Sequence, residues 1–143
     1  KISVTGDAFE KAFTTTEGHP FVLTAYLEKA FDKLQAGERE LALTHFKAAD
    51  VEFVPRTLAP FFSRFYDQAG AASKLILEKI AANANGIASL AELCVALKKE
   101  SNELSPHLAK LVQDGAVIRA DRGKYKLFHH LLSEYIKEKN KKN

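Results

Sequence analysis

The chain has 143 residues, of which 46% are hydrophobic and 27% charged, and it contains seven glycines, four prolines and one cysteine. This composition excludes a disordered or low-complexity chain and provides enough apolar residues for one ordinary domain or two small ones. No apolar run approaches the roughly 18 residues that a membrane-spanning helix needs, so we expect no membrane partner. Cys94 alone excludes an internal disulfide, and the sequence shows no positive-then-apolar leader, so the cytoplasm is the expected compartment.

Charge and aromatic residues are distributed unevenly along the chain. Residues 1–70 hold 8 Lys and Arg against 10 Asp and Glu, a net charge of −2, whereas residues 71–143 hold 13 against 8, a net charge of +5. Nine of the ten phenylalanines precede residue 70, and only Phe128 follows it. These two compositions predict a helical subdomain at 1–70 and a second domain at 71–143. The chain contains no methionine, even at its start, and we expect it to be a piece of a longer protein.

The first two helices of the first half are predicted from their apolar spacing. Asp7 is expected to cap a short helix, and Gly18 is expected to stop it. One side of this helix carries Phe9, Ala12 and Phe13. The second helix has apolar residues three and four positions apart and closes at Gly37. Its apolar positions are Leu23, Tyr26, Leu27, Ala30, Phe31 and Leu34.

Two further helices complete the first half. The third is expected from Glu38 to Val54, with acidic groups in its first turn, and Pro55 is expected to end it. Thr57 is expected to cap the fourth helix, with Pro60 in the first turn. Its stripe consists of Leu58, Phe61, Phe62, Phe65 and Tyr66. We interpret this aromatic stripe as core packing and not as a ligand pocket.

The stretch from Leu75 to Lys126 has the pattern of a winged helix-turn-helix, in which three short helices precede a tight hairpin. The first helix ends at Asn85-Gly86, which is a strong turn signal. Ser89 is expected to begin the second helix in a capping box with Glu92, because each end can then satisfy the amide of the other. The apolar stripe of the second helix places Cys94 in the core, where a reactive thiol is not expected.

The third helix has two alternative starts, since either Asn102 or Ser105 can act as its cap, and it stops at Gly115. The runs "AVIRA" and "KYKLF" flank Asp121-Arg122-Gly123 and predict a β-hairpin, the wing. A last helix is expected to dock on this core through Phe128, Leu131, Leu132, Tyr135 and Ile136. The predicted fold class is therefore mainly α, a helical bundle followed by a winged helix-turn-helix with one small β-hairpin.

A winged helix suggests duplex DNA as a partner, with the third helix in the major groove and the wing on phosphates. The candidate DNA-binding residues are Ser105, His107, Lys110, Arg119, Arg122 and Lys124. The third helix lacks an arginine for bidentate contact with guanine. The alternative is therefore that the wing binds a protein partner and that its charges only keep the surface solvated.

The turn Gly18-His19-Pro20, in "TEGHPFVL", places Pro20 at the favoured first position of a helix. With the helical bundle and winged helix that follow, it resembles the lid region of prokaryotic STAND and archaeal P-loop ATPases, of the AAA+ class. The passage "LAKLVQDGAVIRADRGKYKL" is also similar to the C-terminal winged domain of these ATPases. The resemblance implies that His19 and Pro20 contact ATP or ADP in the parent protein, that residues 1–70 are lid-like, and that a P-loop ATPase domain precedes them. A lid arginine on the γ-phosphate would be Arg56 or Arg64.

The sequence contains no Gly-x-x-x-x-Gly-Lys-Ser/Thr phosphate loop and no strand ending in an acidic pair. We therefore expect no catalytic residue, no ATP hydrolysis and no cofactor in this piece alone. His129-His130 has no second ligand pair at zinc spacing, so no metal site is expected. The leading hypothesis is a non-catalytic C-terminal fragment of a nucleotide-dependent switch or motor ATPase. The alternative is a stand-alone winged-helix DNA-binding transcriptional regulator.

Overall fold

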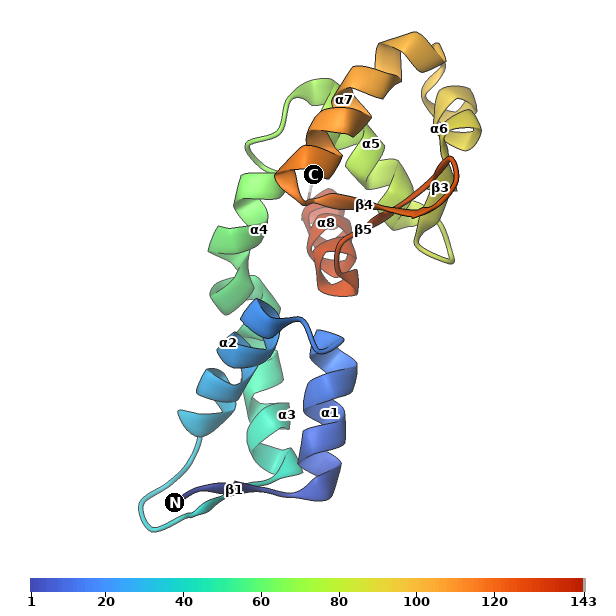
Figure 1. The fold of residues 1–143 in the computed structure, drawn as a ribbon. Helices are drawn as coiled ribbons and strands as arrows, with labels where there is room; N and C mark the ends of the chain where they lie inside the picture. The colour runs from blue at the N-terminus through green and yellow to red at the C-terminus, as the bar shows by residue number, and fades with distance from the viewer. Residues whose placement is uncertain (143) are drawn as a thin grey trace. The chain divides into compact units, whose positions relative to one another are not determined.

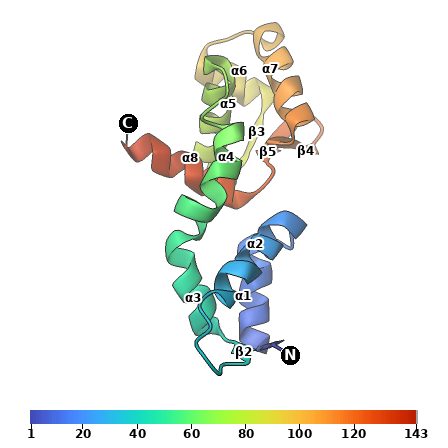
Figure 2. The same cartoon turned by 90° about the vertical axis from the view of Figure 1, so that its left-hand side faces the viewer.

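The computed structural model describes residues 1–142 and is mainly helical, with two small β-sheets (Figures 1 and 2). The expectation of a mainly helical fold with a small antiparallel sheet is confirmed. The chain divides into two compact units, of which the first is Lys1–Pro60 and the second begins at Phe61. Within residues 1–142, no helix combines the length and the apolar character needed to cross a membrane.

The first unit consists of three packed helices with a two-stranded parallel sheet at their ends. Its elements are β1 (Ser3–Val4), α1 (Gly6–Thr16), α2 (Pro20–Phe31), β2 (Glu40–Leu41), α3 (Leu43–Glu52) and the π-helix η1 (Phe53–Leu58). Figures 1 and 2 show α1, α2 and α3 side by side. Tyr26 lies at the centre of their core, with its ring 5.0 Å from that of Phe46 and 4.7 Å from that of Phe53.

The start of α1 differs from the prediction, because Thr5 and not Asp7 occupies the cap position. Both side chains accept from the Ala8 amide, Thr5 Oγ1 at 3.3 Å and Asp7 Oδ1 at 2.8 Å. Of the predicted apolar face, only Ala12 is buried. Phe9 and Phe13 are exposed by 56% and 44%, and the buried side of α1 consists of Ala8, Ala12 and Thr16.

The boundaries of the second and third helices are wrong in the prediction. The second helix ends at Phe31, before Gly37, and the third begins at Leu43, after Glu38. The third helix starts late because Glu40 and Leu41 pair with Ser3 and Val4 as a parallel strand, so the backbone of these two residues cannot be helical.

The predicted break at Pro55 does not occur. Phe53–Leu58 is a π-helical segment that leads directly into α4 (Ala59–Phe65), so Thr57 lies inside a helix and is not a cap. A π-type turn shifts the hydrogen-bond register, and such a shift can accommodate a residue that lacks an N–H. The boundary between the units falls inside α4 and not at residue 70. The rings of Phe61 and Phe62 lie 6.0 and 6.2 Å from that of Phe128, which places them in the second unit.

The second unit packs helices around a three-stranded antiparallel sheet in the order β3-β5-β4. Its elements after α4 are α5 (Ala71–Ala82), β3 (Ile87–Ser89), α6 (Leu90–Leu97), α7 (Ser101–Asp114), β4 (Val117–Asp121), β5 (Lys124–Leu127) and α8 (His130–Lys142). The predicted hairpin, the helix end at Gly115 and the final helix packed on α5 are confirmed. Strand β3 was not predicted.

The cap of α6 is confirmed in part. Ser89 Oγ accepts from the Glu92 amide at 3.1 Å, whereas the Glu92 carboxylate accepts from Asn83 Nδ2 at 3.4 Å. Ser89 also pairs with Lys124 in the sheet, and its backbone therefore belongs to a strand as well as to a cap. Cys94 is half-buried, so its predicted core position is wrong, and Leu93 fills that position.

Neither predicted start of α7 is correct, because the helix begins at Ser101 with Glu100 as its cap residue. Glu103 Oε1 accepts from the Glu100 amide at 3.1 Å, and the Glu103 amide donates to the Glu100 carbonyl at 3.0 Å. Pro106 lies inside the helix and not in its first turn. The additional N-terminal turn puts the predicted site residues Ser105 and His107 in the body of the helix.

Candidate functional site

The β4–β5 hairpin is a rigid part of the second unit and not an isolated flap. Strand β3 pairs with β5 from Ile87↔Lys126 to Ser89↔Lys124, and the Leu90 amide donates to the Gly123 carbonyl at 3.1 Å. Gly123 has φ +71°, which the tight turn requires. The register shifts between Arg119 and Asp121, a bulge that increases the local twist of the hairpin.

The hairpin carries more positive than negative charge on its surface. Its exposed cationic residues are Arg119, Arg122, Lys124 and Lys126. Within residues 1–142, none of the four forms an ion pair with a carboxylate. The one acidic side chain of the hairpin, Asp121, accepts from the Arg122 amide at 2.7 Å. Unpaired surface cations are available to an anionic partner, such as a phosphate or a carboxylate.

Helix α7 presents the other predicted DNA-binding residues on its exposed face. Ser105, His107 and Lys110 are exposed, whereas Leu104, Leu108 and Leu111 on the opposite face are buried. The Ser105 hydroxyl donates to the Ser101 carbonyl at 2.7 Å and is thus engaged within its own helix. The six predicted residues therefore form two groups, three on α7 and three on the hairpin, and the hairpin group is the more strongly basic.

His107 and Lys110 also border a hollow that the sequence did not reveal. Its volume is about 690 Å³, and it lies between the α4–α5 connection and the C-terminal half of α7. One side of the hollow consists of Arg64 and Phe65 from α4, Gln68, Ala69 and Gly70 from the connection, and Ser73 from α5. The other side consists of His107, Lys110, Leu111 and Asp114 from α7, with Ala116 after the cap residue Gly115. The one sequence feature that points to this hollow is the run Gly70-Ala71-Ala72, which starts α5 without a capping side chain.

The Gly18-His19-Pro20 turn forms between α1 and α2 as predicted. Gly18 has φ +71°, and a Cβ there would lie 3.4 Å from Phe13 Cε1, so the turn favours glycine. His19 Nδ1 accepts from the Val22 amide at 3.4 Å as the cap of α2, and Pro20 is the first helical residue. Pro20 is exposed, as is the neighbouring Phe21. The nucleotide contact of His19 and Pro20 stays a prediction.

The two candidate lid arginines belong to different units. Arg56 lies in the π-helix of the first unit, with its side chain 81% exposed and Nη1 3.9 Å from Glu52 Oε2. Arg64 lies in α4 on the side of the second unit, where its guanidinium carbon is 5.4 Å from the centre of the Phe61 ring. Only Arg56 thus shares a compact unit with the Gly18-His19-Pro20 turn.

Three tyrosine–carboxylate pairs have perturbed pKa values. Burial, followed by hydrogen bonds to Asp50, Glu78 and Asp67, raises the pKa values of Tyr26, Tyr66 and Tyr135 well above the usual range. The hydroxyls of Tyr26 and Tyr66 lie 2.5 Å from Asp50 Oδ1 and 2.6 Å from Glu78 Oε1. Phenols held protonated in this way act as hydrogen-bond donors within the fold, and their role is structural.

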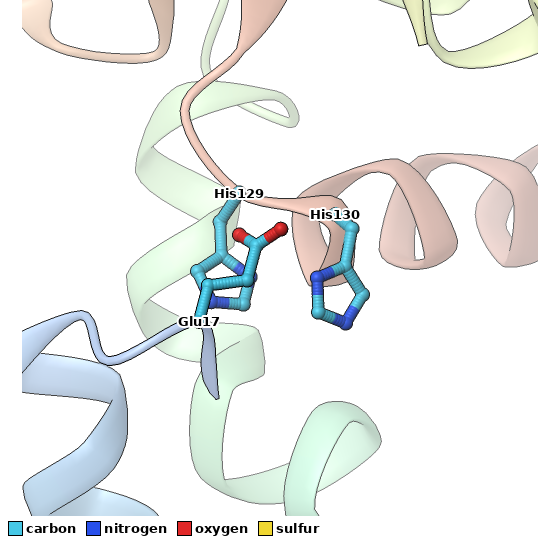
Figure 3. A group of neighbouring side chains, drawn as sticks. All are labelled: Glu17, His129 and His130. Atoms are coloured by element: carbon cyan, nitrogen blue, oxygen red, sulfur yellow. The ribbon is translucent and has the colours of Figure 1, made fainter. Parts of the chain in front are cut away.

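The His129-His130 pair precedes and begins α8, and Figure 3 shows its two imidazoles. Their rings stack with centroids 4.7 Å apart, His129 is buried, and its Nδ1 accepts from the Leu131 amide at 3.1 Å. Glu17, also drawn in Figure 3, is the C-cap residue of α1 and belongs to the first unit. The second unit therefore contributes two adjacent imidazoles, fewer than the three protein ligands typical of a catalytic zinc centre. The absence of a metal site stays a prediction.

The resemblance to switch ATPases thus depends on one turn and on the order of the elements behind it. Both features are present in the structure, but neither is specific to one function. Comparison of the chain with protein-family models, with curated proteins and with solved structures finds no significant match.

Proposed function

We propose that this chain is the non-catalytic C-terminal part of a cytoplasmic nucleotide-dependent switch or motor ATPase of the STAND or archaeal type. In this proposal the first unit is the lid, and Pro20 and His19 contact ATP or ADP that a preceding P-loop domain holds. The second unit is a winged helix, which passes the nucleotide state to a protein partner or to DNA.

The order of elements in the second unit is the observation that carries the proposal. From α5 to α8 it runs helix, strand, helix, helix, hairpin, helix, with β3 paired to the second strand of the hairpin. A helix-turn-helix with a strand-paired wing has this arrangement. In this assignment α7 occupies the position of the recognition helix and the β4–β5 hairpin that of the wing.

The turn in front of α2 supports the lid assignment for the first unit. The cap geometry fixes the His19 ring through Nδ1, and the exposed Pro20 ring offers an apolar edge at a helix start. An exposed proline and an imidazole held by a backbone amide can pack against a planar base without rearrangement of the helix. No phosphate-binding group is needed in this unit, since the proposed parent supplies it.

The proposal is tested first upstream of Lys1. The native reading frame is expected to encode a Gly-x-x-x-x-Gly-Lys-Ser/Thr loop within roughly 150 to 250 residues, the size of one additional domain. In the intact parent, Pro20→Ala should weaken nucleotide binding about fivefold, on the order of 1 kcal/mol for one lost apolar contact. Pro106→Ala, at an exposed proline of α7, is the matched control. Unchanged nucleotide affinity in Pro20→Ala would reduce the turn to a helix connector.

A stand-alone DNA-binding regulator is the second candidate, and the four unpaired cations of the hairpin favour it. In this alternative the hairpin binds backbone phosphates, and α7 contributes only Lys110 and His107 toward the bases. Binding would therefore depend strongly on salt and weakly on DNA sequence.

Fluorescence anisotropy of a labelled DNA duplex tests this candidate. If all four cations meet phosphates, the logarithm of the binding constant should fall with the logarithm of salt concentration at a slope of about −3 to −4. The double variant Arg122→Ala, Lys124→Gln should lower the magnitude of the slope by about 2. Lys47→Gln, at an exposed lysine of the first unit, should leave it unchanged. Negligible binding even at low salt would remove the DNA hypothesis and leave the protein partner.

A further inference from the structure

The start of α5 borders the 690 Å³ hollow described above through Gly70 and Ser73, and its first turn offers unused hydrogen-bond donors. Its cap residue is Gly70, which has no side chain to accept from the first-turn amides. The first intrahelical bond runs from the Lys74 amide to the Gly70 carbonyl at 2.9 Å, so the amides of residues 71–73 precede the helical ladder. Such amides, together with the helix dipole, attract an anion.

Ser73 adds an independent sign of a ligand at this place. The residue is 92% buried, since only 8% of its surface is exposed, and it lines the hollow. Within residues 1–142, its hydroxyl has no protein hydrogen-bond partner and is accessible to solvent, since every fully buried polar side-chain atom of the described residues has a partner. Because the hydroxyl is not sealed inside the protein, the hollow is the space in which its partner would sit.

The charged groups around the hollow favour an anion. Arg64 and Lys110 line it from opposite elements, and neither forms an ion pair with a carboxylate of the described residues. Asp114 is the one acidic residue of the lining, and it is exposed. Phe65, which is half-buried, supplies an aromatic surface in the same wall.

We propose that this hollow binds a phosphorylated small molecule. The phosphate lies at the start of α5, where it accepts from the amides of residues 71–73 and from the Ser73 hydroxyl and is neutralised by Arg64 and Lys110. The volume exceeds what one phosphate occupies and falls within the roughly 300 to 1,000 Å³ typical of small-molecule sites, so the ligand has an organic part that packs on Phe65. This inference does not rest on the proposed ATPase function, because it involves neither the Gly18-His19-Pro20 turn nor the hairpin.

Amide chemical shifts measured by NMR on the ¹⁵N-labelled chain test the site directly. The probes are inorganic phosphate, phenyl phosphate and, as the uncharged analogue, phenol. Phenyl phosphate should shift the amides of residues 71–73 at lower concentration than phosphate, and phenol should not shift them. Ser73→Ala and Lys110→Gln should each weaken binding by at least about fivefold, the loss of one charge-assisted hydrogen bond. Lys124→Gln on the hairpin should not.

Two substitutions at Gly70 make the test independent of any general loss of charge. Gly70 has φ −66°, and a Cβ there meets no atom within 4 Å, so other residues fit. Gly70→Asp supplies a carboxylate to the same amides; it should raise the thermal midpoint and abolish phosphate binding. Gly70→Ala, which adds a Cβ but no cap, should still bind.

Several results would overturn the proposal. One is an absence of shifts at residues 71–73 with either phosphate compound. Another is unchanged binding in Ser73→Ala, Lys110→Gln and Gly70→Asp, which would mean unspecific attraction to a basic surface. If duplex DNA shifts these amides and the small phosphates do not, the anion is a backbone phosphate, and the site belongs to a nucleic-acid interface. Preserved dispersion of the remaining amide signals shows in each case that the variant is folded.

Discussion

The two units of this chain use aromatic and charged residues in opposite ways. The first unit exposes four phenylalanines by 44% to 56%, namely Phe9, Phe13, Phe21 and Phe31. In the second unit the large hydrophobic residues at the surface are aliphatic, and its phenylalanines are buried or half-buried. Residues 1–60 carry 7 basic against 9 acidic side chains, whereas residues 61–143 carry 14 against 9.

This difference indicates that the two surfaces suit different partners. Exposed aromatic rings gain free energy when they are covered, and aromatic residues are enriched at protein interfaces. Unpaired cations on a stiff hairpin instead suit an anionic partner. The contrast is compatible with a first unit that packs on a neighbouring domain and a second unit that carries the output, as the proposed function requires.

The largest expected effect tests whether the phenylalanine rings of the first unit divide into buried rings, which stabilise the core, and exposed rings, which do not. Phe46 is fully buried beside Tyr26, so Phe46→Ala should lower the free energy of unfolding by about 3–5 kcal/mol. Phe9→Ala, which removes a 56% exposed ring, should cost less than about 1 kcal/mol. Urea unfolding followed by NMR measures the free energy of unfolding of each unit separately. Equal losses in both variants would show that the ring of Phe9 is buried in solution.

The next effect concerns the hydrogen bond from Tyr135 to the Asp67 carboxylate in the second unit. The Tyr135 hydroxyl donates to Asp67 Oδ2, and Lys139 Nζ lies 3.7 Å from the same oxygen. Tyr135→Phe keeps the ring and removes the donor, so it should cost about 1.5–3 kcal/mol, the range for a hydrogen bond to a charged group. Tyr125→Phe is the control, because Tyr125 is half-buried and its hydroxyl has no hydrogen-bond partner within residues 1–142. Chemical denaturation at neutral pH measures the free energy of unfolding of both variants.

The hydrogen bond between Tyr135 and Asp67 predicts that the stability of the second unit depends on pH. Burial acts to raise the pKa of Asp67, but hydrogen bonds from Tyr135 and Ser63 and the charge of Lys139 outweigh it, and the pKa lies below its ordinary value of 3.8. A depressed folded-state pKa adds stability above the unfolded pKa, and this stability disappears as the pH falls from 3.8 through the folded-state pKa. Tyr135→Phe should therefore lose less stability than the wild type on acidification. Parallel acid titrations of both proteins would contradict the assignment.

The smallest expected effect compares two glycines of the second unit. Gly115 ends α7 with φ +88°, where a side chain is strained, so Gly115→Ala should cost about 1 kcal/mol. Gly70→Ala, at φ −66° in open space, should be close to neutral, because the lower entropy of the unfolded chain is offset by the poorer N-cap. Thermal unfolding of the pair checks the sign of each change. A harmless Gly115→Ala would mean that α7 ends differently from this structure.

The sequence predicted the second unit better than the first because its helix ends carry strong local signals. Ser89 and Gly115 lie at the observed boundaries of α6 and α7, whereas Asn85-Gly86 forms the turn before β3 and the preceding helix already ends at Ala82. In the first unit the strand at Glu40 and Leu41 exists only because Ser3 and Val4 pair with it. No local pattern of two residues can reveal such a partner, so the sequence predicts a third helix that includes these strand residues.

The candidate site likewise has one part that the sequence predicts, the hairpin cations, and one part that it does not, the hollow. The hairpin cations follow from a local alternation of residues around Asp121-Arg122-Gly123, and the structure places them as expected. The hollow joins residues 64–73 to residues 107–116, and this neighbourhood arises only from the packing of α5 on α7. Ser73 is unusual because the residue is largely buried while its hydroxyl reaches the hollow, and burial is not visible in the sequence.

Strand β3 has a consequence for how a signal could pass through the second unit. Within four consecutive residues, Ile87 to Leu90, the chain pairs with β5, caps α6 and binds the carbonyl of the hairpin turn. A partner that pulls or tilts the hairpin therefore strains the start of α6 directly, without help from side-chain packing. In hydrogen exchange, the amides of β3, β5 and the first turn of α6 should open as one cooperative group, and they should slow together when the hairpin is bound.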